Sequence, residues 1–228
     1  MRILSVFVFS LLVAACQPAP SSELSDQNFT IATDQRSETL AVADATDQTV
    51  SFRDGTLVLR VNKPAEWESF STENGIVIGE HFGSVATGGV LEGVMTYTFV
   101  TPLQDFIAQP RTGANIAQVI LGEMLADPIY SAGITATVPT GFEWGEYAAA
   151  YTLLTGKDGN VTIMLGVVVP EIETLLSCTV SSPYAGHQRL RDLLPTLLDG
   201  LVLNNIVFKG DALMVLPDPL KFPKYRKS

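Results

Sequence analysis

The sequence EYAAAYTLLTGKDGNVTIMLGVVV, residues 146–169, contains two apolar segments separated by a short polar connection. Residues 156–160, GKDGN, combine two glycines with Asp and Asn, which are the residues that tight turns between antiparallel strands prefer. The second segment, Val161–Val169, is apolar almost throughout, as is typical of a central strand covered on both faces. The stretch therefore predicts a hairpin of Glu146–Thr155 and Val161–Val169 at the centre of a sheet.

Further strands are expected on both sides of this hairpin. The Asp-Gly pair at residues 54–55 predicts a first hairpin between Thr49–Arg53 and Thr56–Asn62. Apolar or alternating runs predict the other strands, which are Gly75–Glu80, Val90–Thr101, Ile134–Val138 and Ile172–Ser181. The sequence therefore predicts a central antiparallel sheet of about six or seven strands.

Two helices are expected to flank this sheet. Asn115–Ala126 carries one broad apolar stripe, has N-cap chemistry at its start and is stopped by Asp127-Pro128. Ser182-Pro183 predicts the start of a final helix that reaches about Leu203, with Pro195 expected to kink or split it. Its apolar stripe is formed by Leu190, Leu194, Leu197, Leu198 and Leu201. Strands and helices in this order predict an α+β domain.

The first sixteen residues, MRILSVFVFSLLVAAC, are typical of a bacterial lipoprotein signal peptide. Arg2 precedes an uncharged apolar run of roughly a dozen residues, which is shorter than the 20 or so that a membrane-spanning helix needs. Val13-Ala14-Ala15-Cys16 resembles a lipobox, so we expect cleavage before Cys16 and lipidation of that cysteine. The alternative is an ordinary cleaved secretory signal, because Ala-x-Ala-like ends also suit the general signal peptidase.

Four segments are therefore expected. Residues 1–15 form the signal peptide, and residues 16–48 form a flexible tether because they are rich in Ser, Thr, Asp, Gln, Ala and Pro. Residues 49–208 form the α+β domain. Residues 209–228 form a proline-containing tail with a basic end, which either contacts anionic lipid, is solvated, or wraps against the acidic domain.

The composition argues against nucleic acid as a partner. The chain has 14 basic and 24 acidic residues and a net charge of −10, whereas phosphate binding needs clustered Lys and Arg. It has two cysteines. If Cys16 carries lipid, Cys178 has no intramolecular disulfide partner, and its place in the alternating Ile172–Val180 segment predicts a small buried side chain.

Catalytic motifs are not apparent, and no metal site or cofactor is predicted. With His81 and His187 as the only histidines, a multi-histidine metal centre is impossible, and no HExxH, CxxC, glycine-rich phosphate loop or GxSxG occurs. His81 is expected at a strand rim and His187 on a helix face. Trp67, Phe142 and Trp144 are candidates for lining a ligand pocket, although aromatic residues beside turns more often fill a core.

Residues 49–208 resemble the PsbP/DcrB-like group, which includes Mog-type proteins and mycobacterial lipoproteins of the LpqN type. The resemblance rests on Leu57–Val61 running into Lys63-Pro64-Ala65-Glu66-Trp67, on the hairpin around Gly156–Asn160, and on a closing helix that leads to Leu201-Val202-Leu203. It implies a central antiparallel sheet flanked by helices and favours a non-enzymatic role. No functional residue of the group is carried over.

These observations predict a lipid-anchored lipoprotein of the bacterial cell envelope that acts as a binding or assembly module, with an envelope protein or a small apolar ligand as its partner. The alternatives are an envelope enzyme with a site assembled from scattered residues and a carrier of a small apolar ligand. The sequence does not indicate the oligomeric state.

Overall fold

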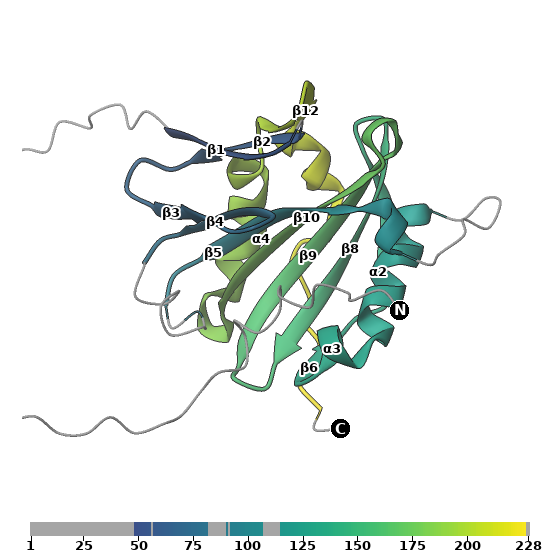
Figure 1. Cartoon of the computed structure of the whole chain (residues 1–228). Helices are drawn as coiled ribbons and strands as arrows, with labels where there is room; N and C mark the ends of the chain where they lie inside the picture. Colours follow the sequence, from purple (N-terminus) through teal and green to yellow (C-terminus); the bar gives the residue numbers. More distant parts are fainter. Residues whose placement is uncertain (1–47, 56, 82–89, 91, 107–114, 227–228) are drawn as a thin grey trace, which may run out of the picture.

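The computed structural model describes residues 48–226, except residues 56, 82–89, 91 and 107–114 (Figure 1). The predicted signal peptide, Cys16 and almost all of the predicted tether lie outside these residues. The described chain forms an α+β domain, so the predicted fold class is confirmed. It differs from the prediction in having two antiparallel sheets instead of one.

The larger sheet has eight strands, and the hairpin quoted above lies inside it. Its strands are, in spatial order, β3 (Glu68–Ser71), β4 (Gly75–Gly79), β5 (Met95–Pro102), β10 (Thr174–Pro183), β9 (Asn160–Val169) and β8 (Tyr147–Gly156), followed by β6 (Ile134–Ala136) and β7 (Thr140–Trp144), which both pair with β8. As predicted, β9 is central and almost fully buried. The short strands β3 and β7 are not predicted from the sequence.

The smaller sheet has four strands in the order β1 (Gln48–Asp54), β2 (Leu57–Lys63), β11 (Leu201–Leu203) and β12 (Ile206–Phe208). The predicted Asp-Gly turn joins β1 to β2, and Gly55 has the positive φ of 55° that such a turn requires. The expectation that the final helix reaches Leu203 is wrong. Leu201–Leu203 pairs with β2 instead, so the first hairpin and the end of the chain share a sheet.

Three helices lie in the described chain: α2 (Ile116–Ala126), α3 (Pro128–Ser131) and α4 (His187–Leu197). Asn115 caps α2 as predicted, because its side-chain oxygen accepts a hydrogen bond from the Gln118 amide at 3.1 Å. The expected cap of the final helix at Ser182-Pro183 is wrong. These residues end β10, and a short 3-10 turn, η4 (Tyr184–Gly186), precedes α4. Pro195 lies inside α4, which ends two residues later.

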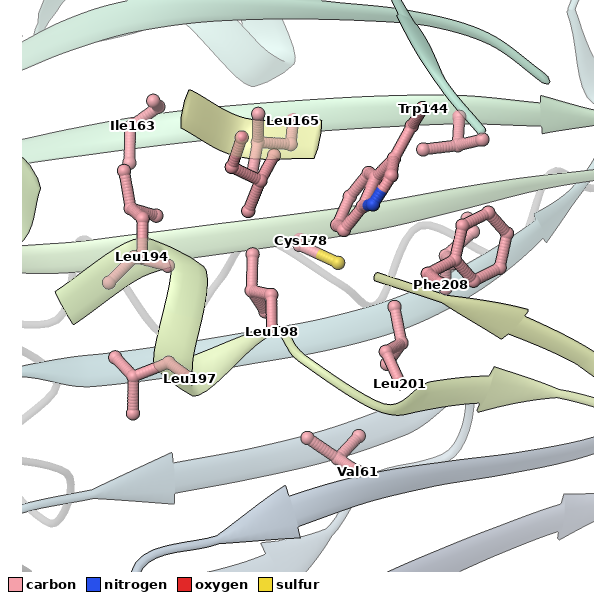
Figure 2. Packing of buried hydrophobic residues seen from close by; sticks show 14 of the residues in the cluster. Val61, Trp144, Ile163, Leu165, Cys178, Leu194, Leu197, Leu198, Leu201 and Phe208 are labelled. Atoms are coloured by element: carbon pink, nitrogen blue, oxygen red, sulfur yellow. The ribbon is translucent and has the colours of Figure 1, made fainter. Parts of the chain in front are cut away.

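Each face of the larger sheet has its own core. On one face, α2 packs on β8 and β9. Gly166 of β9 allows Leu121 of α2 to come close, because a Cβ on residue 166 would lie only 3.2 Å from Cδ2 of Leu121. The other face carries the larger core, which Figure 2 shows between α4, the smaller sheet and the central strands. The labelled leucines of α4 and the residues that follow it, Leu194, Leu197 and Leu198, are buried there.

The C-terminal segment from Lys209 to Arg226 also belongs to the domain. It contains the 3-10 helix η5 (Gly210–Val215), and its leucines at 213, 216 and 220 are each at most 4% exposed within the larger core. Further along, Thr155 Oγ1 donates a hydrogen bond to the Pro223 carbonyl at 2.6 Å. The domain boundary predicted at residue 208 is therefore too early, and of the three expectations for the tail the intramolecular one matches the packing. Apolar burial and the hydrogen bonds that Arg191 and Trp144 donate to carbonyls of this segment make the contact.

Candidate functional site

The three aromatic residues predicted to line a pocket do not lie together. Trp67 precedes β3 and Phe142 and Trp144 lie in β7, at opposite edges of the larger sheet. Trp144 is 1% exposed, its ring lies edge-on to Phe208, and its indole N–H donates to the Lys209 carbonyl at 2.7 Å. Its one polar group is therefore already used, and Trp144 fills the core, as aromatic residues beside turns usually do.

Phe142 and Trp67 are half-buried against the same larger core. Phe142 meets Tyr151 edge to face, with ring centroids 6.2 Å apart. Trp67 is held by a turn, since its amide donates to the Pro64 carbonyl at 3.0 Å. The turn after Lys63 therefore directs Trp67 toward the core.

Cys178 lies in β10 and is 1% exposed, as predicted from its alternating segment. Burial raises the pKa of its thiol from 9.0 to about 12, and the neighbouring Thr98 in β5 opposes the rise only in part. The thiol is therefore protonated at neutral pH. Because the thiolate is the nucleophile, Cys178 is a packing residue and not a reactive group.

Two buried cations, Lys63 and Arg191, are bonded to main-chain carbonyls. Lys63 is 6% exposed, and its ammonium donates to the carbonyls of Pro64, Ala65 and Trp67, which fixes the turn between the two sheets. Arg191, also 6% exposed, donates from α4 to three carbonyls of the C-terminal segment at 3.1–3.2 Å. Both satisfy the rule that a buried charge needs partners, and both have structural roles. The sequence contains no signal for the role of Arg191, because its carbonyls lie more than twenty residues away, whereas those at Lys63 lie within four residues.

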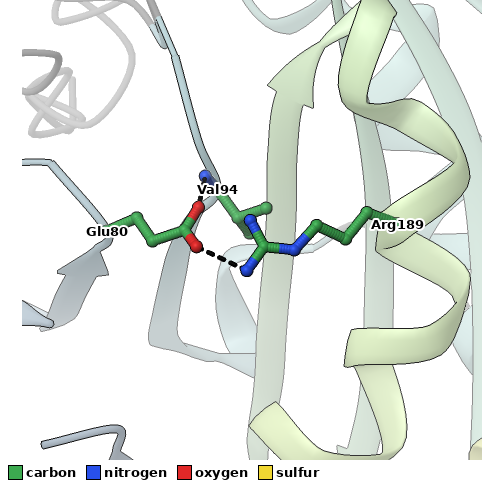
Figure 3. A network of polar contacts seen from close by, with 3 residues as sticks. All are labelled: Glu80, Val94 and Arg189. Carbon is green, nitrogen blue, oxygen red and sulfur yellow. Dashed lines mark hydrogen bonds and ion pairs between the residues drawn. The ribbon is translucent and has the colours of Figure 1, made fainter. Parts of the chain in front are cut away.

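The first turn of α4 is joined to the end of β4 by an ion pair. Glu80 accepts from Arg189 at 2.5 Å and from the Val94 amide at 2.9 Å (Figure 3). Arg189 is half exposed, so the pair adds little stability by itself. His81, next to Glu80, is exposed, which agrees with a strand rim. His187 begins α4, where its ring stacks on Tyr184 with centroids 4.4 Å apart and its Nδ1 lies 2.5 Å from the Tyr184 carbonyl.

Carboxylates gather at the other end of the sheet, around Tyr147. Burial raises the pKa of the Tyr147 hydroxyl, and the negative charges of Glu171 and Glu146 raise it further.

Within the described part of the chain, no three His, Cys, Asp or Glu side chains come together as metal ligands would. In the same part, no helix has the length and hydropathy needed to cross a membrane.

Comparison with known proteins gives likeness of structure only. No protein-family model matches the chain, and no curated protein matches it in sequence. The similar solved structures include the cyanobacterial PsbP (CyanoP) of Synechocystis sp. PCC 6803, with 10% identity, a TM-score of 0.45, and 68% of this chain and 91% of that one covered. They also include the Ran-binding protein Mog1p of Saccharomyces cerevisiae, with 9% identity, a TM-score of 0.39, and 65% and 83% covered. Both names fall in the group that the sequence resembles, and the likeness concerns fold alone.

Proposed function

We propose that this chain is an exported bacterial lipoprotein, held on a membrane of the cell envelope by lipid on Cys16, whose α+β domain is a non-catalytic binding or assembly module. The observation that carries the proposal is the sequence of residues 1–16, in which a charged start and an uncharged apolar run end at Val13-Ala14-Ala15-Cys16. A lipoprotein cysteine carries at least two acyl chains, and two are enough for stable anchoring.

The start of the domain supports the same proposal. The first strand begins at Gln48, and the residues between Cys16 and this strand are rich in Ser, Thr, Asp, Gln, Ala and Pro, a composition that suits a tether. A flexible segment of about 32 residues reaches roughly 30 Å, which lets the domain stand clear of the membrane surface. Cys178 is buried as a free thiol, so it does not compete for Cys16 as a disulfide partner.

The absence of catalysis in this proposal rests on how the buried polar groups are used. The Cys178 thiol is protonated, the Trp144 indole N–H is bonded within the core, and the charges of Lys63 and Arg191 are used on main-chain carbonyls. An active site instead holds titratable groups that face a shared space and are not used for packing. Met214 and Val215, adjacent and each over 60% exposed, offer apolar surface that suits a protein partner.

Fractionation of the host cells tests the anchor. The parent chain is expected in the membrane fraction and labelled by radioactive fatty acid, whereas Cys16→Ser is expected to be unlabelled. Cys178→Ala is the matched control, since it removes the other cysteine and is expected to keep both label and location. Labelling of Cys16→Ser, or an unlabelled parent chain, would contradict the proposal.

The binding role has its own test. In-cell crosslinking of the parent chain, followed by detergent extraction, is expected to trap a specific envelope partner, and the joint change Met214→Ser/Val215→Ser is expected to reduce its yield several-fold. If crosslinking traps nothing while purified protein converts a substrate, the chain is the envelope enzyme and the binding proposal is wrong.

A further inference from the structure

Cations of the domain gather at one end of the larger sheet. Lys157 lies in the turn between β8 and β9, and its amide donates to the Gly133 carbonyl at 2.8 Å. The last residues of the C-terminal segment reach the same place, because the Arg226 amide donates to Thr135 Oγ1 at 2.9 Å, two residues beyond Gly133. Figure 1 shows this segment emerging beside β6. We call the exposed residues Lys157, Lys221, Lys224 and Arg226 the basic end.

Packing of main chain and rings holds the basic end in place. Phe222, between two of its lysines in sequence, lies edge-on to the ring of His187, which stacks on Tyr184. The Tyr184 amide donates to the Gly159 carbonyl at 3.1 Å, in the same turn as Lys157. None of these contacts uses the ammonium or guanidinium groups, so the charges are held on a fixed backbone and face solvent. Asp158, the acid in this turn, is bonded to Asn160.

The opposite end of the sheet is acidic. Exposed Glu143 and Glu146 lie on either side of Trp144-Gly145, where β7 turns into β8, and exposed Glu171 and Glu173 lie between β9 and β10. Along β8, β9 and β10 the domain is therefore electrically polar, although Glu68 and Glu80 lie at the basic strand end near the opposite edge of the sheet and the chain as a whole is strongly acidic. A polar charge distribution orients a protein at a charged surface.

We propose that the basic end docks on an anionic lipid bilayer and so sets the orientation of the anchored domain, with the acidic end facing away. Tyrosines accompany the charges: Tyr184 is 55% exposed and Tyr225 is 36% exposed, and tyrosine is favoured where lipid headgroups meet water. Each Lys or Arg near an anionic leaflet strengthens partitioning about five-fold. The inference deepens the proposed function, because a tether of roughly 30 Å brings a face to the membrane without selecting which one.

Vesicle binding tests the docking surface apart from the anchor. The probe is the mature chain from residue 16 carrying Cys16→Ser, mixed with vesicles of phosphatidylcholine and phosphatidylglycerol or of phosphatidylcholine alone. We expect binding to the anionic vesicles only, and its loss at about 1 M salt, where the Debye length falls to about 3 Å. Because this chain carries no lipid, the result does not depend on whether Cys16 is acylated in the cell.

Two charge-matched triple variants make the test specific. Lys157→Gln/Lys224→Gln/Arg226→Gln is expected to weaken vesicle binding about 100-fold. Arg53→Gln/Arg60→Gln/Lys209→Gln changes the net charge equally at exposed sites on or beside the smaller sheet and is expected to change binding less than about five-fold. Lys157→Arg/Lys224→Arg/Arg226→Lys keeps the charges and should bind like the parent.

Three outcomes would overturn the proposal: equal binding to neutral vesicles, equal loss in both triple variants, or no vesicle binding by the folded parent chain. Binding to polyglutamate without binding to anionic vesicles would likewise overturn it, because the basic end would then fit an acidic protein partner. A circular dichroism melt at the parental midpoint shows that each variant is folded.

Discussion

Gly210 lies against the last turn of α4, where a side chain has no room. A Cβ at this position would lie 1.8 Å from the Pro195 carbonyl oxygen, which is main chain and moves only with its helix. Gly210→Ala is therefore expected to cost about 2–3 kcal/mol of unfolding free energy, seen as a fall of roughly 5–10 °C in the thermal midpoint. Gly122→Ala is the control, because a Cβ there meets nothing within 4 Å inside α2 and should stabilise by about 0.5–1 kcal/mol. If Gly210→Ala and Gly122→Ala change the unfolding free energy equally, the close contact between Gly210 and Pro195 is wrong.

The Cys178 thiol gives a prediction in pH. In the unfolded chain it ionises near its ordinary pKa of 9.0, whereas the folded pKa is about 12, so its contribution to stability is complete below pH 9 and is lost as the pH rises toward 12. The loss is at most about 1.4 kcal/mol per pH unit. In denaturant titrations, the difference in unfolding free energy between the parent chain and Cys178→Ala should therefore become smaller as the pH rises above 9. At pH 8, alkylation of the folded thiol should be about 1,000-fold slower than that of the unfolded thiol, and fast alkylation would contradict its burial.

Burial of Cys178 and capping by Asn115 are predictable from sequence because both depend on near neighbours in the chain. The roles of Arg191 and Trp144 are not, because each side chain is satisfied by a carbonyl more than twenty residues away, whose position the tertiary fold sets. From the sequence, Trp144 is therefore a candidate for a ligand pocket. In the structure its indole N–H donates to the carbonyl of Lys209, which explains why the side chain can lie in the core.

At the scale of elements, Asn115 joins α2 to the larger sheet. Its oxygen caps the helix, while its Nδ2 donates to the carbonyls of Ala149 at 2.9 Å and Phe142 at 3.3 Å. Asn115→Ala removes all three bonds and is expected to cost about 2–3 kcal/mol, whereas Asn115→Ser keeps a capping oxygen and should cost less. Chemical denaturation measures both. A Ser variant as unstable as the Ala variant would show that the cap contributes nothing.

Arg191 is expected to hold the C-terminal segment on α4. Arg191→Ala leaves the carbonyls of Met214, Leu216 and Pro217 without their donor and should cost about 3 kcal/mol or more. Trypsin should then cut faster at Lys209 and Lys221, because the segment opens. Arg189→Ala is the control from the same helix, with an expected cost below about 1 kcal/mol because that arginine is half exposed. If trypsin cuts Arg191→Ala no faster than the parent chain, Arg191 does not hold the C-terminal segment on α4.

Most elements that the sequence predicts have long, strong patterns, namely the two hairpins, β4, β5, β10 and α2, and the short β6 is predicted as well. The strands it misses are short and half polar, as in ESFS of β3 and TGFEW of β7. The sequence predicts that Leu201–Leu203 continues the last helix, because Leu197, Leu198 and Leu201 fit a helical period. Gly200, with a φ of 69°, ends that helical run and lets the chain pair with β2.

At the scale of the whole molecule, the division into two sheets is the largest difference from the prediction. It depends on Arg60 pairing with Val202, across more than 140 residues, and local patterns carry no information on such a partner. Local patterns likewise separate the C-terminal segment from the domain. Its prolines indicate extended backbone, but only the fold shows that Leu213, Leu216 and Leu220 complete the larger core.

This completion gives a prediction for the whole domain. A chain that ends at Phe208, the boundary expected from sequence, lacks three buried leucines, each worth about 2 kcal/mol or more, and the carbonyls that Arg191 needs. Typical domains have only 5–15 kcal/mol of stability, so we expect this chain to be unfolded at 37 °C. Circular dichroism should show a cooperative transition for a chain ending at Arg226 and none for the shorter chain. A cooperative transition in both would show that the segment is dispensable.

The intact mass of the protein purified from detergent-solubilised host membranes tests most directly whether lipid on Cys16 holds the domain on a membrane. We expect a polypeptide that begins at Cys16 and carries the added mass of a diacylglyceryl group, with Cys178 unmodified. An unmodified N-terminus beyond Cys16, or a chain that still carries residues 1–15, would contradict it.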